Sequence, residues 1–172
     1  SYISRWLGSL DFIEEDYILY MQEDFILYDN VDKDEISRCL EYLKNNDCSC
    51  IRFIRSGLNS LDGLEENNIY KISHFKSPDL SFTHQPSIWK KDHFIKVMET
   101  LNPQSIRDVE SSGTFNGSNI MNQLGYNSSF YFDTSSYLRG GHYDSKIFPY
   151  VATALIGGKW NVSQYSEELN NI

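Results

Sequence analysis

Two adjacent acids inside an apolar run are the first residues with evident chemistry. In "YILYMQEDFILYD", residues 17–29, Glu23 and Asp24 stand between aliphatic and aromatic side chains. Burying an ionised carboxylate without a partner is costly, so we expect the pair at an edge of the fold or beside a cation. Carboxylate oxygens are ligands that Mg²⁺ and Mn²⁺ prefer. The pair is therefore a candidate metal site, and a solvated turn is the plainer interpretation.

A second pair of acids lies in "RDVE", where Asp108 and Glu110 follow a predicted helix. A carboxylate placed in a loop beside a substrate can act as a general base and remove the proton of a hydroxyl nucleophile. Taken alone, the same two acids are more simply described as solvated loop charge. The sequence leaves both interpretations open.

The segment "FTHQPSIWKKD", residues 82–92, combines polar side chains with a large aromatic one. His84 and Gln85 offer hydrogen bonds, and the flat apolar face of Trp89 suits stacking against a sugar ring or an apolar acceptor. We treat all three as candidate acceptor-binding residues. For Trp89 the alternative is a place in the hydrophobic core.

Two further residues could neutralise a phosphate group. Arg139 and His142 stand in "RGGHYDS", where the paired glycines permit unusual backbone geometry. Either residue could instead be an ordinary loop residue, and Lys159 with Trp160 in "GGKW" is open to the same two interpretations.

The elements that must position these residues begin with a strand over "DYILYM", residues 16–21, which reads as buried because β-forming side chains run without polar interruption. A helix should follow within residues 30–47, with Asp32 as N-cap and Glu35 three residues later. A second strand is predicted over 50–54. Strand, acidic turn, helix and strand in this order predict a crossover unit in a parallel or mixed sheet. Glu23 and Asp24 would then lie at the carboxyl end of the first strand, where ligands bind in open α/β sheets.

The rest of the chain fits one α/β domain over residues 1–172, with a mixed, mostly parallel sheet flanked by helices. Further strands are predicted over 68–72, 128–133 and 150–155. Helices are predicted over 1–10, 88–101, 120–125 and 163–172, the last with Ser163 as its cap.

Composition narrows the range of functions. The formal net charge is −9, from 24 acids against 15 Lys and Arg, and such a surface repels nucleic-acid backbones. The three cysteines do not have zinc-site spacing and suit reduced thiols, so we expect a cytoplasmic protein. No apolar run reaches the ~20 residues of a transmembrane segment. G-x-S-x-G, Walker and G-x-G-x-x-G motifs do not occur, so serine hydrolase, P-loop and Rossmann functions have no support.

Taken in order, three segments resemble a known family. The run "DYILYMQEDFIL…VDKDEI…CLEYL" is similar to the middle of microbial and viral glycosyltransferases of the GT-A type, close to family two, in which a hydrophobic strand ends in an acidic D-x-D-like motif. "FTHQPSIWKKDHFIKVM" followed by "DVE" resembles the acceptor-side segment of that family. "PYVATALIGGKWN" resembles its last strand and the turn after it.

The resemblance implies transfer of a sugar from a nucleotide-diphosphate donor to a hydroxyl of a glycan or other acceptor, with Mn²⁺ or Mg²⁺ as cofactor. By motif matching, Asp24 with Glu23 would bind the metal and the diphosphate. Glu110, or in second place Asp108, would be the acceptor base. Direct attack by the deprotonated hydroxyl would invert the anomeric carbon.

The family places a nucleotide-binding half before the acidic strand, whereas here some sixteen residues precede it. We therefore expect this chain to be a fragment of a longer glycosyltransferase. Two other functions stay open at this stage. One is a catalytically silent GT-A-like binding or assembly domain, and the other is a metal-dependent phosphohydrolase that uses Glu23 and Asp24.

Overall fold

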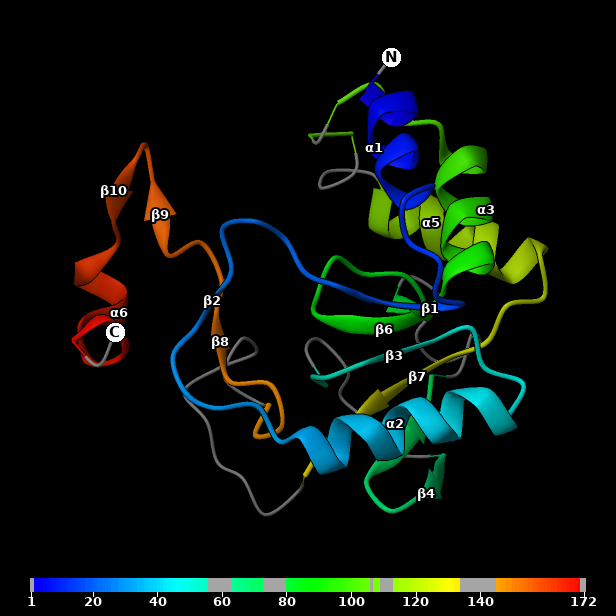
Figure 1. Cartoon of the computed structure of the whole chain (residues 1–172), viewed down its shortest axis with the longest axis horizontal. Helices are drawn as coiled ribbons and strands as arrows, with labels where there is room; N and C mark the ends of the chain where they lie inside the picture. The colour runs from blue at the N-terminus through cyan, green and yellow to red at the C-terminus, as the bar shows by residue number, and fades with distance from the viewer. Residues whose placement is uncertain are drawn as a thin grey trace.

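A six-stranded mixed sheet in the order β1-β6-β3-β7-β5-β4 forms the centre of the computed structural model (Figure 1). The structure describes residues 2–55, 63–72, 80–105, 107–108, 113–133 and 145–170. The strands of this sheet are β1 (Tyr17–Tyr20), β3 (Cys50–Arg52), β4 (Leu64–Glu66), β5 (Ile69–Lys71), β6 (Ser87–Lys90) and β7 (Ser128–Tyr131). Two smaller ribbons pair β2 (Ile26–Leu27) with β8 (Tyr150–Val151) and β9 (Leu155–Ile156) with β10 (Lys159–Trp160).

Helices cover both faces of the sheet, as expected for an α/β fold (Figure 1). One face packs against α2 through a core that includes Leu43, Ile51 and Ile88. The other packs against α1, α3 and α5 through a core that includes Ile18 and Trp89. The helices are α1 (Tyr2–Leu10), α2 (Lys33–Asn45), α3 (Lys91–Leu101), α5 (Gly113–Gln123) and α6 (Val162–Leu169).

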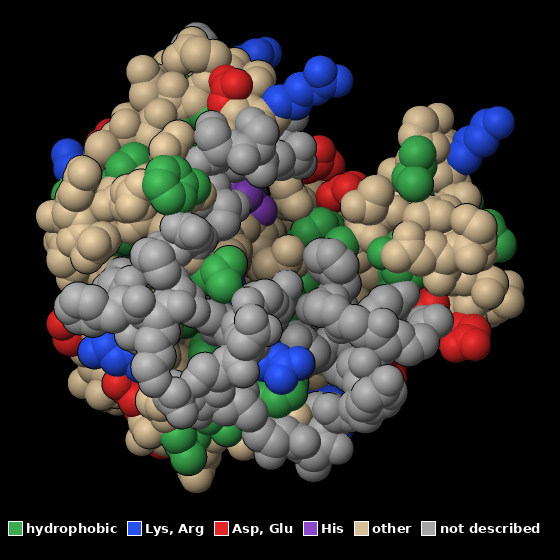
Figure 2. Space-filling view, turned by 180° about the vertical axis from the view of Figure 1, so that it is seen from behind, with side chains coloured by type: hydrophobic (Ala, Val, Ile, Leu, Met, Phe, Trp, Pro, Cys, Tyr) green, Lys and Arg blue, Asp and Glu red, His purple; other side chains and the backbone are tan. Residues whose placement is uncertain are grey.

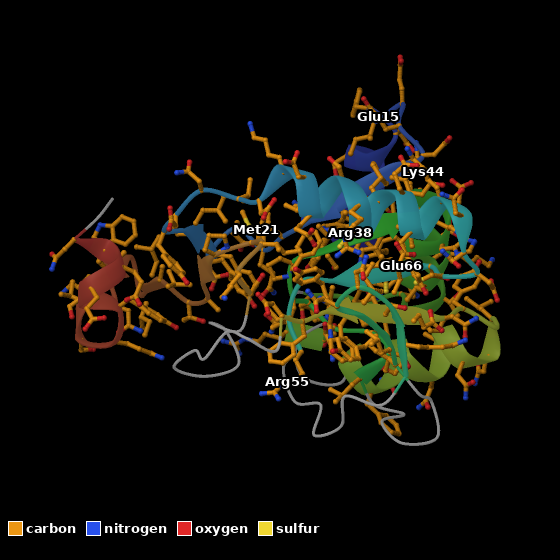
Figure 3. The ribbon with its side chains drawn as sticks, turned by 90° about the horizontal axis from the view of Figure 1, so that it is seen from below. Glu15, Met21, Arg38, Lys44, Arg55 and Glu66 are labelled. Carbon is orange, nitrogen blue, oxygen red and sulfur yellow. The ribbon has the colours of Figure 1, made fainter. Side chains whose placement is uncertain are left out.

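The start of α2 confirms the predicted cap. The backbone of Asp32 is extended, and its Oδ1 accepts a hydrogen bond of 3.1 Å from the N–H of Glu35. Such a bond satisfies one of the N–H groups that have no partner within the first turn. At mid-helix, Arg38 forms an ion pair with Glu35 and donates to the carbonyl of Asn67, which joins α2 to the turn between β4 and β5 (Figure 3).

The sheet is mostly antiparallel, which corrects the expectation of a mostly parallel one. β6 runs antiparallel to β1 on one side and to β3 on the other, and β3–β7 is the parallel pair among the described strands. The crossover from β1 through α2 to β3 does leave β1 and β3 running in the same direction. The later strand β6 lies between them, and this position cannot be derived from the order of elements along the chain.

Two predicted helices begin at other residues than expected, α3 later and α6 earlier. Residues 88–90 are strand rather than helix, because Ile88 and Trp89 pair with residues of both β1 and β3, and α3 begins at Lys91. The closing helix α6 begins at Val162 with Asn161 at its N-cap, so Ser163 lies inside the helix. The strand predicted over 150–155 is divided into β8 and β9, with a left-handed residue, Thr153, between them.

The C-terminal elements form a small unit beside the sheet. The β9–β10 hairpin and α6 lie apart from the six-stranded sheet and are reached through the β2–β8 ribbon (Figure 1). Their own core joins Val151, Ala154 and Tyr165, with Ile26 and Leu169 packed against it. Within the described part of the chain, no helix has the length and apolar character that crossing a membrane requires.

Candidate functional site

The acidic pair occupies a tight turn directly after β1. The N–H of Phe25 donates to the carbonyl of Gln22 at 3.2 Å, which closes the turn around Glu23 and Asp24. The N–H of Ala154 donates to the carbonyl of Asp24 at 3.3 Å and attaches the turn to the C-terminal unit. Glu23 is exposed and Asp24 is half-buried, so both carboxylates lie at the sheet edge rather than in the core. The prediction that the pair directly follows the first strand is confirmed.

His84 and Gln85 come to the same end of the sheet from the opposite direction. They precede β6, which runs antiparallel to β1, and in that register Tyr20 stands opposite Ser87. The last residue of β1 and the first residue of β6 are therefore neighbours. The segment that follows β1 and the segment that precedes β6 consequently meet at one edge of the sheet.

Tyr150 connects the two segments. Its phenol ring stacks on Phe25, the residue after Asp24, with ring centroids 5.1 Å apart and an interplanar angle of 27°. Its hydroxyl donates a hydrogen bond to Oε1 of Gln85. The ring of Tyr150 is completely buried. One side chain of β8 thus contacts both the acidic turn and the segment predicted to bind the acceptor.

His84 is held by aromatic side chains. The hydroxyl of Tyr20, the last residue of β1, lies 3.3 Å from Nδ1 of His84. The ring of Phe82 meets the imidazole edge-on, at 5.0 Å between centroids and 83° between planes. His84 is buried, with 8% of its surface exposed. These contacts fix the orientation of the imidazole at the sheet edge.

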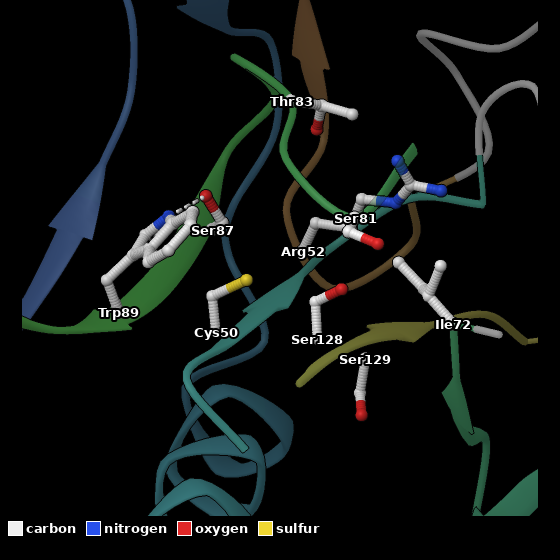
Figure 4. A pocket seen from close by; sticks show the side chains of 9 residues that line it. All are labelled: Cys50, Arg52, Ile72, Ser81, Thr83, Ser87, Trp89, Ser128 and Ser129. Atoms are coloured by element: carbon white, nitrogen blue, oxygen red, sulfur yellow. Dashed lines mark hydrogen bonds between the residues drawn. The ribbon is translucent and has the colours of Figure 1, made fainter. Parts of the chain in front are cut away.

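Trp89 is a core residue. Its side chain is 1% exposed and contacts the rings of Phe82 and Phe94, and its indole N–H donates to the hydroxyl of Ser87 at 2.9 Å (Figure 4). The stacking face predicted for a sugar is therefore covered by protein in this structure. Of the two interpretations of Trp89, the structure supports the core residue.

Neither cavity beside a tryptophan resembles the predicted acceptor site. The cavity beside Trp89, lined also by Cys50 and Ser128, measures about 10 Å³ (Figure 4), which is room for about one water molecule. A surface groove of about 300 Å³ lies in the C-terminal unit, between Trp160, Val162, Leu169 and Asn170. Trp160 is half exposed and forms one wall of this groove.

Arg55 brings a positive charge to the same sheet end, and the sequence analysis did not identify it. It lies three residues after β3, whose last residue, Arg52, pairs with Ser87 at the start of β6. Its guanidinium stands 4.6 Å from the ring centroid of Phe132, just beyond β7 (Figure 3 labels Arg55). Arg55 thus places a cation at the same end of the sheet as the acidic turn.

Asp108 has a structural role in the short segment after α3. Its Oδ2 accepts hydrogen bonds from the N–H groups of Gln104 and Ser105, at 2.9 and 3.0 Å, and the hydroxyl of Ser105 lies 3.3 Å from the N–H of Asp108. This arrangement caps the local turn and favours the interpretation of Asp108 as loop charge. Three other predicted site residues, Glu110, Arg139 and His142, lie outside the described residues.

The residues of the acidic turn fit a divalent cation in part. Magnesium is commonly bound through one or two carboxylates together with phosphate oxygens and water, and Glu23 and Asp24 offer two carboxylates on a fixed turn. Among the side chains that the structure describes, no group of three or more His, Cys, Asp or Glu could hold a metal ion.

On the surface, a histidine side chain is visible within a recess on one face of the molecule, with acidic side chains near its rim (Figure 2).

The aromatic residues that organise the site, Tyr20, Phe25 and Tyr150, were not predicted as site residues. Tyr20 and Phe25 flank the acidic pair closely in the sequence, and this spacing was the available signal. No sequence pattern around Tyr150 indicated a role in the site, because its partners Phe25 and Gln85 lie far from it along the chain.

Comparison with known proteins leaves the family open. The sequence matches no protein-family model, and no curated protein matches it either.

Proposed function

We propose that this chain carries the metal, diphosphate and acceptor side of a sugar-transfer site. Glu23 and Asp24 bind Mn²⁺ or Mg²⁺ together with the diphosphate of a nucleotide sugar. His84 and Gln85 bind the acceptor, and Glu110 removes the proton of the attacking hydroxyl. The bound metal supplies charge stabilisation for the departing diphosphate.

The observation that carries this proposal is the meeting of two distant segments at one sheet edge. Transfer between a donor and an acceptor requires that both be held within reach of each other. Tyr150 contacts Phe25 beside the acidic turn and Gln85 beside β6, so the two groups of predicted residues share one local structure. The resemblance of three segments to GT-A glycosyltransferases, described above, supports the same assignment of roles.

Arg55 adds support for an anionic ligand. A nucleotide diphosphate brings more negative charge than one divalent cation neutralises, so a nearby guanidinium favours its binding. Arg55 follows β3 at the sheet end where the acidic turn lies. Arg139 and His142 remain proposed as further partners of the diphosphate.

Calorimetry with the full chain tests the proposal directly. UDP, GDP, CDP and TDP are titrated separately in the presence and absence of Mn²⁺, and we expect at least one to bind only with the metal. Asp24→Asn should abolish that binding while the circular dichroism spectrum and the melting temperature stay unchanged. Asp29→Asn, a change at an exposed acid five positions away, serves as the matched control and should bind normally.

A catalytically silent binding or assembly domain is the alternative, and the burial of Trp89 favours it because a predicted acceptor face is covered. If none of the four nucleotides binds this chain, and none binds a chain extended at its N-terminus, the transferase proposal fails. Metal-dependent binding that persists unchanged in Asp24→Asn would instead refute the assignment of the metal site.

A further inference from the structure

Tyr150 occupies a junction that the proposed reaction does not yet use. Its ring is buried and stacks on Phe25, next to the acidic turn. Its hydroxyl forms a hydrogen bond with Gln85, just before β6. Phe25 is itself 6% exposed and directly follows Asp24. In a close-packed interior, a displacement of one of these rings displaces its neighbour. Tyr150 therefore connects the backbone of the acidic turn with a side chain on the acceptor side.

The hydrogen bond also determines which end of the Gln85 amide faces outward. A glutamine amide has one acceptor oxygen and two N–H donors, and the surrounding hydrogen bonds decide its orientation. Here Oε1 accepts from the hydroxyl of Tyr150. The NH₂ group is thereby directed to partners other than Tyr150. Gln85 is half-buried, so part of the residue borders solvent at the sheet edge.

We propose that Tyr150 is a positioning residue that presents Gln85 as a hydrogen-bond donor to an oxygen of the bound ligand and couples Gln85 to the acidic turn. The inference rests on the proposed function, because it takes a divalent cation on Glu23 and Asp24 as one of the coupled events. A ligand that offers a hydroxyl or phosphate oxygen at this position is accepted. A ligand that offers only an N–H donor leaves the Gln85 amide unpaired and binds more weakly.

The test follows the side-chain amide of Gln85 by nuclear magnetic resonance on the ¹⁵N-labelled full chain. The loss of a signal in Gln85→Glu assigns that amide, and Mg²⁺ is then titrated into the wild-type protein and into Tyr150→Phe. In the wild type we expect the backbone amides of the acidic turn and the Gln85 side-chain amide to shift together. In Tyr150→Phe the turn should still respond, while the response of Gln85 is lost. The side-chain amide of Gln123, exposed on α5, is the control and should not move in either protein.

The outcomes separate this inference from the proposed function. If Mg²⁺ shifts the turn but leaves the Gln85 amide unchanged in the wild type, or if Tyr150→Phe responds like the wild type, the coupling is refuted and the metal site stands. If Mg²⁺ shifts neither, the coupling inferred here is refuted, while the calorimetric titration of nucleotide with metal decides the proposed function separately.

A metal-free comparison keeps the positioning role testable if Tyr150→Phe folds poorly. Gln85→Met removes the acceptor of the same hydrogen bond from the more exposed side. We expect it to shift the backbone amides of Tyr150 and Phe25 while the rest of the spectrum is preserved. Unchanged Tyr150 and Phe25 signals would refute the link, whereas a general loss of stability without that local pattern would show a role in packing alone.

Discussion

Gly117 lies directly against the ring of Phe82. A Cβ at position 117 would stand 2.7 Å from Cγ of Phe82 and closer still to Cδ1, so α5 approaches the segment before β6 at a distance that only glycine allows. The N–H of Phe82 also donates to the hydroxyl of Ser118, at 3.0 Å. Because Phe82 contacts His84 edge-on, this approach helps to set the position of the imidazole.

Gly117→Ala should therefore destabilise the protein by about 1–3 kcal/mol, the usual cost of overpacking a core. In a helix the same substitution ordinarily stabilises by about 0.5–1 kcal/mol. Gly8→Ala in α1 is the matched control, since a Cβ there meets nothing within 4 Å, and it should stabilise. Urea unfolding of both variants measures the change in the free energy of unfolding, which should fall for Gly117→Ala and rise for Gly8→Ala. Equal changes in the two variants would contradict the packing of Gly117 on Phe82.

His93 should make the stability of the fold depend on pH. Its ring stacks on Tyr126 with centroids 4.0 Å apart, and its Nδ1 lies 2.8 Å from the hydroxyl of Ser49. Burial, and then the nearby Lys90, lower the pKa of His93 below its ordinary value of 6.5, with Asp92 and Asp47 acting in the opposite direction. Near neutral pH and above, the neutral imidazole suits the folded state. As the pH falls through 6.5 toward the lower pKa of the folded state, the unfolded chain binds the proton more readily, and stability is lost.

The measurement is the free energy of unfolding at pH 7.5 and at more acidic values, in the wild type and in His93→Gln. We expect the wild type to lose more stability on acidification than the variant does. Parallel curves for the two proteins would show that His93 does not contribute to the pH dependence.

The three cysteines should be unreactive in the folded protein. Burial raises the pKa of Cys39 to about 12 and raises the pKa values of Cys48 and Cys50 as well. Because the thiolate is the reactive form, modification by an aromatic disulfide reagent at pH 8 should be slow for all three. In urea the same reagent should react rapidly with all three thiols of the chain. A fast thiol in the native protein would contradict the burial of these residues.

Asp108 and Glu110 should respond differently to substitution. Asp108→Ala removes a carboxylate that accepts two backbone hydrogen bonds, and we expect a loss of about 0.5–1.5 kcal/mol of stability. Glu110→Gln should preserve stability and donor binding and remove turnover, in line with its proposed role as the base. Thermal melts and a donor-consumption assay separate the two effects, and full activity in Glu110→Gln would refute that role.

How much of this fold the sequence predicts is seen most clearly at β1 and β6. The apolar run over 17–20 and the capped helix after it depend on local patterns, and both were predicted. Ile88 and Trp89 were predicted to be helical because their apolar spacing continues into α3. Their strand conformation comes from pairing with β1 and β3, which no pattern within residues 82–101 reveals.

The candidate site divides in the same way. The placement of Glu23 and Asp24 at a strand end followed from their flanking residues. The contact of Phe25 with Tyr150, and of Tyr150 with Gln85, joins residues far apart in the chain, so it requires the folded structure. The burial of Trp89 was left open because a tryptophan suits both a core and a ligand surface, although a core is the commoner place.

The order of the sheet has a consequence for the synthesis of the chain. β3, at the centre, is flanked by β6 and β7, which are both translated much later. While the ribosome is still adding residues 53–127, β3 lacks at least one of its two neighbouring strands. Ile51, which is fully buried in the folded protein, therefore stays incompletely covered during this time. Because contacts between distant segments form slowly, we expect the nascent chain to stay in an open, chaperone-accessible state until residues 128–131 emerge.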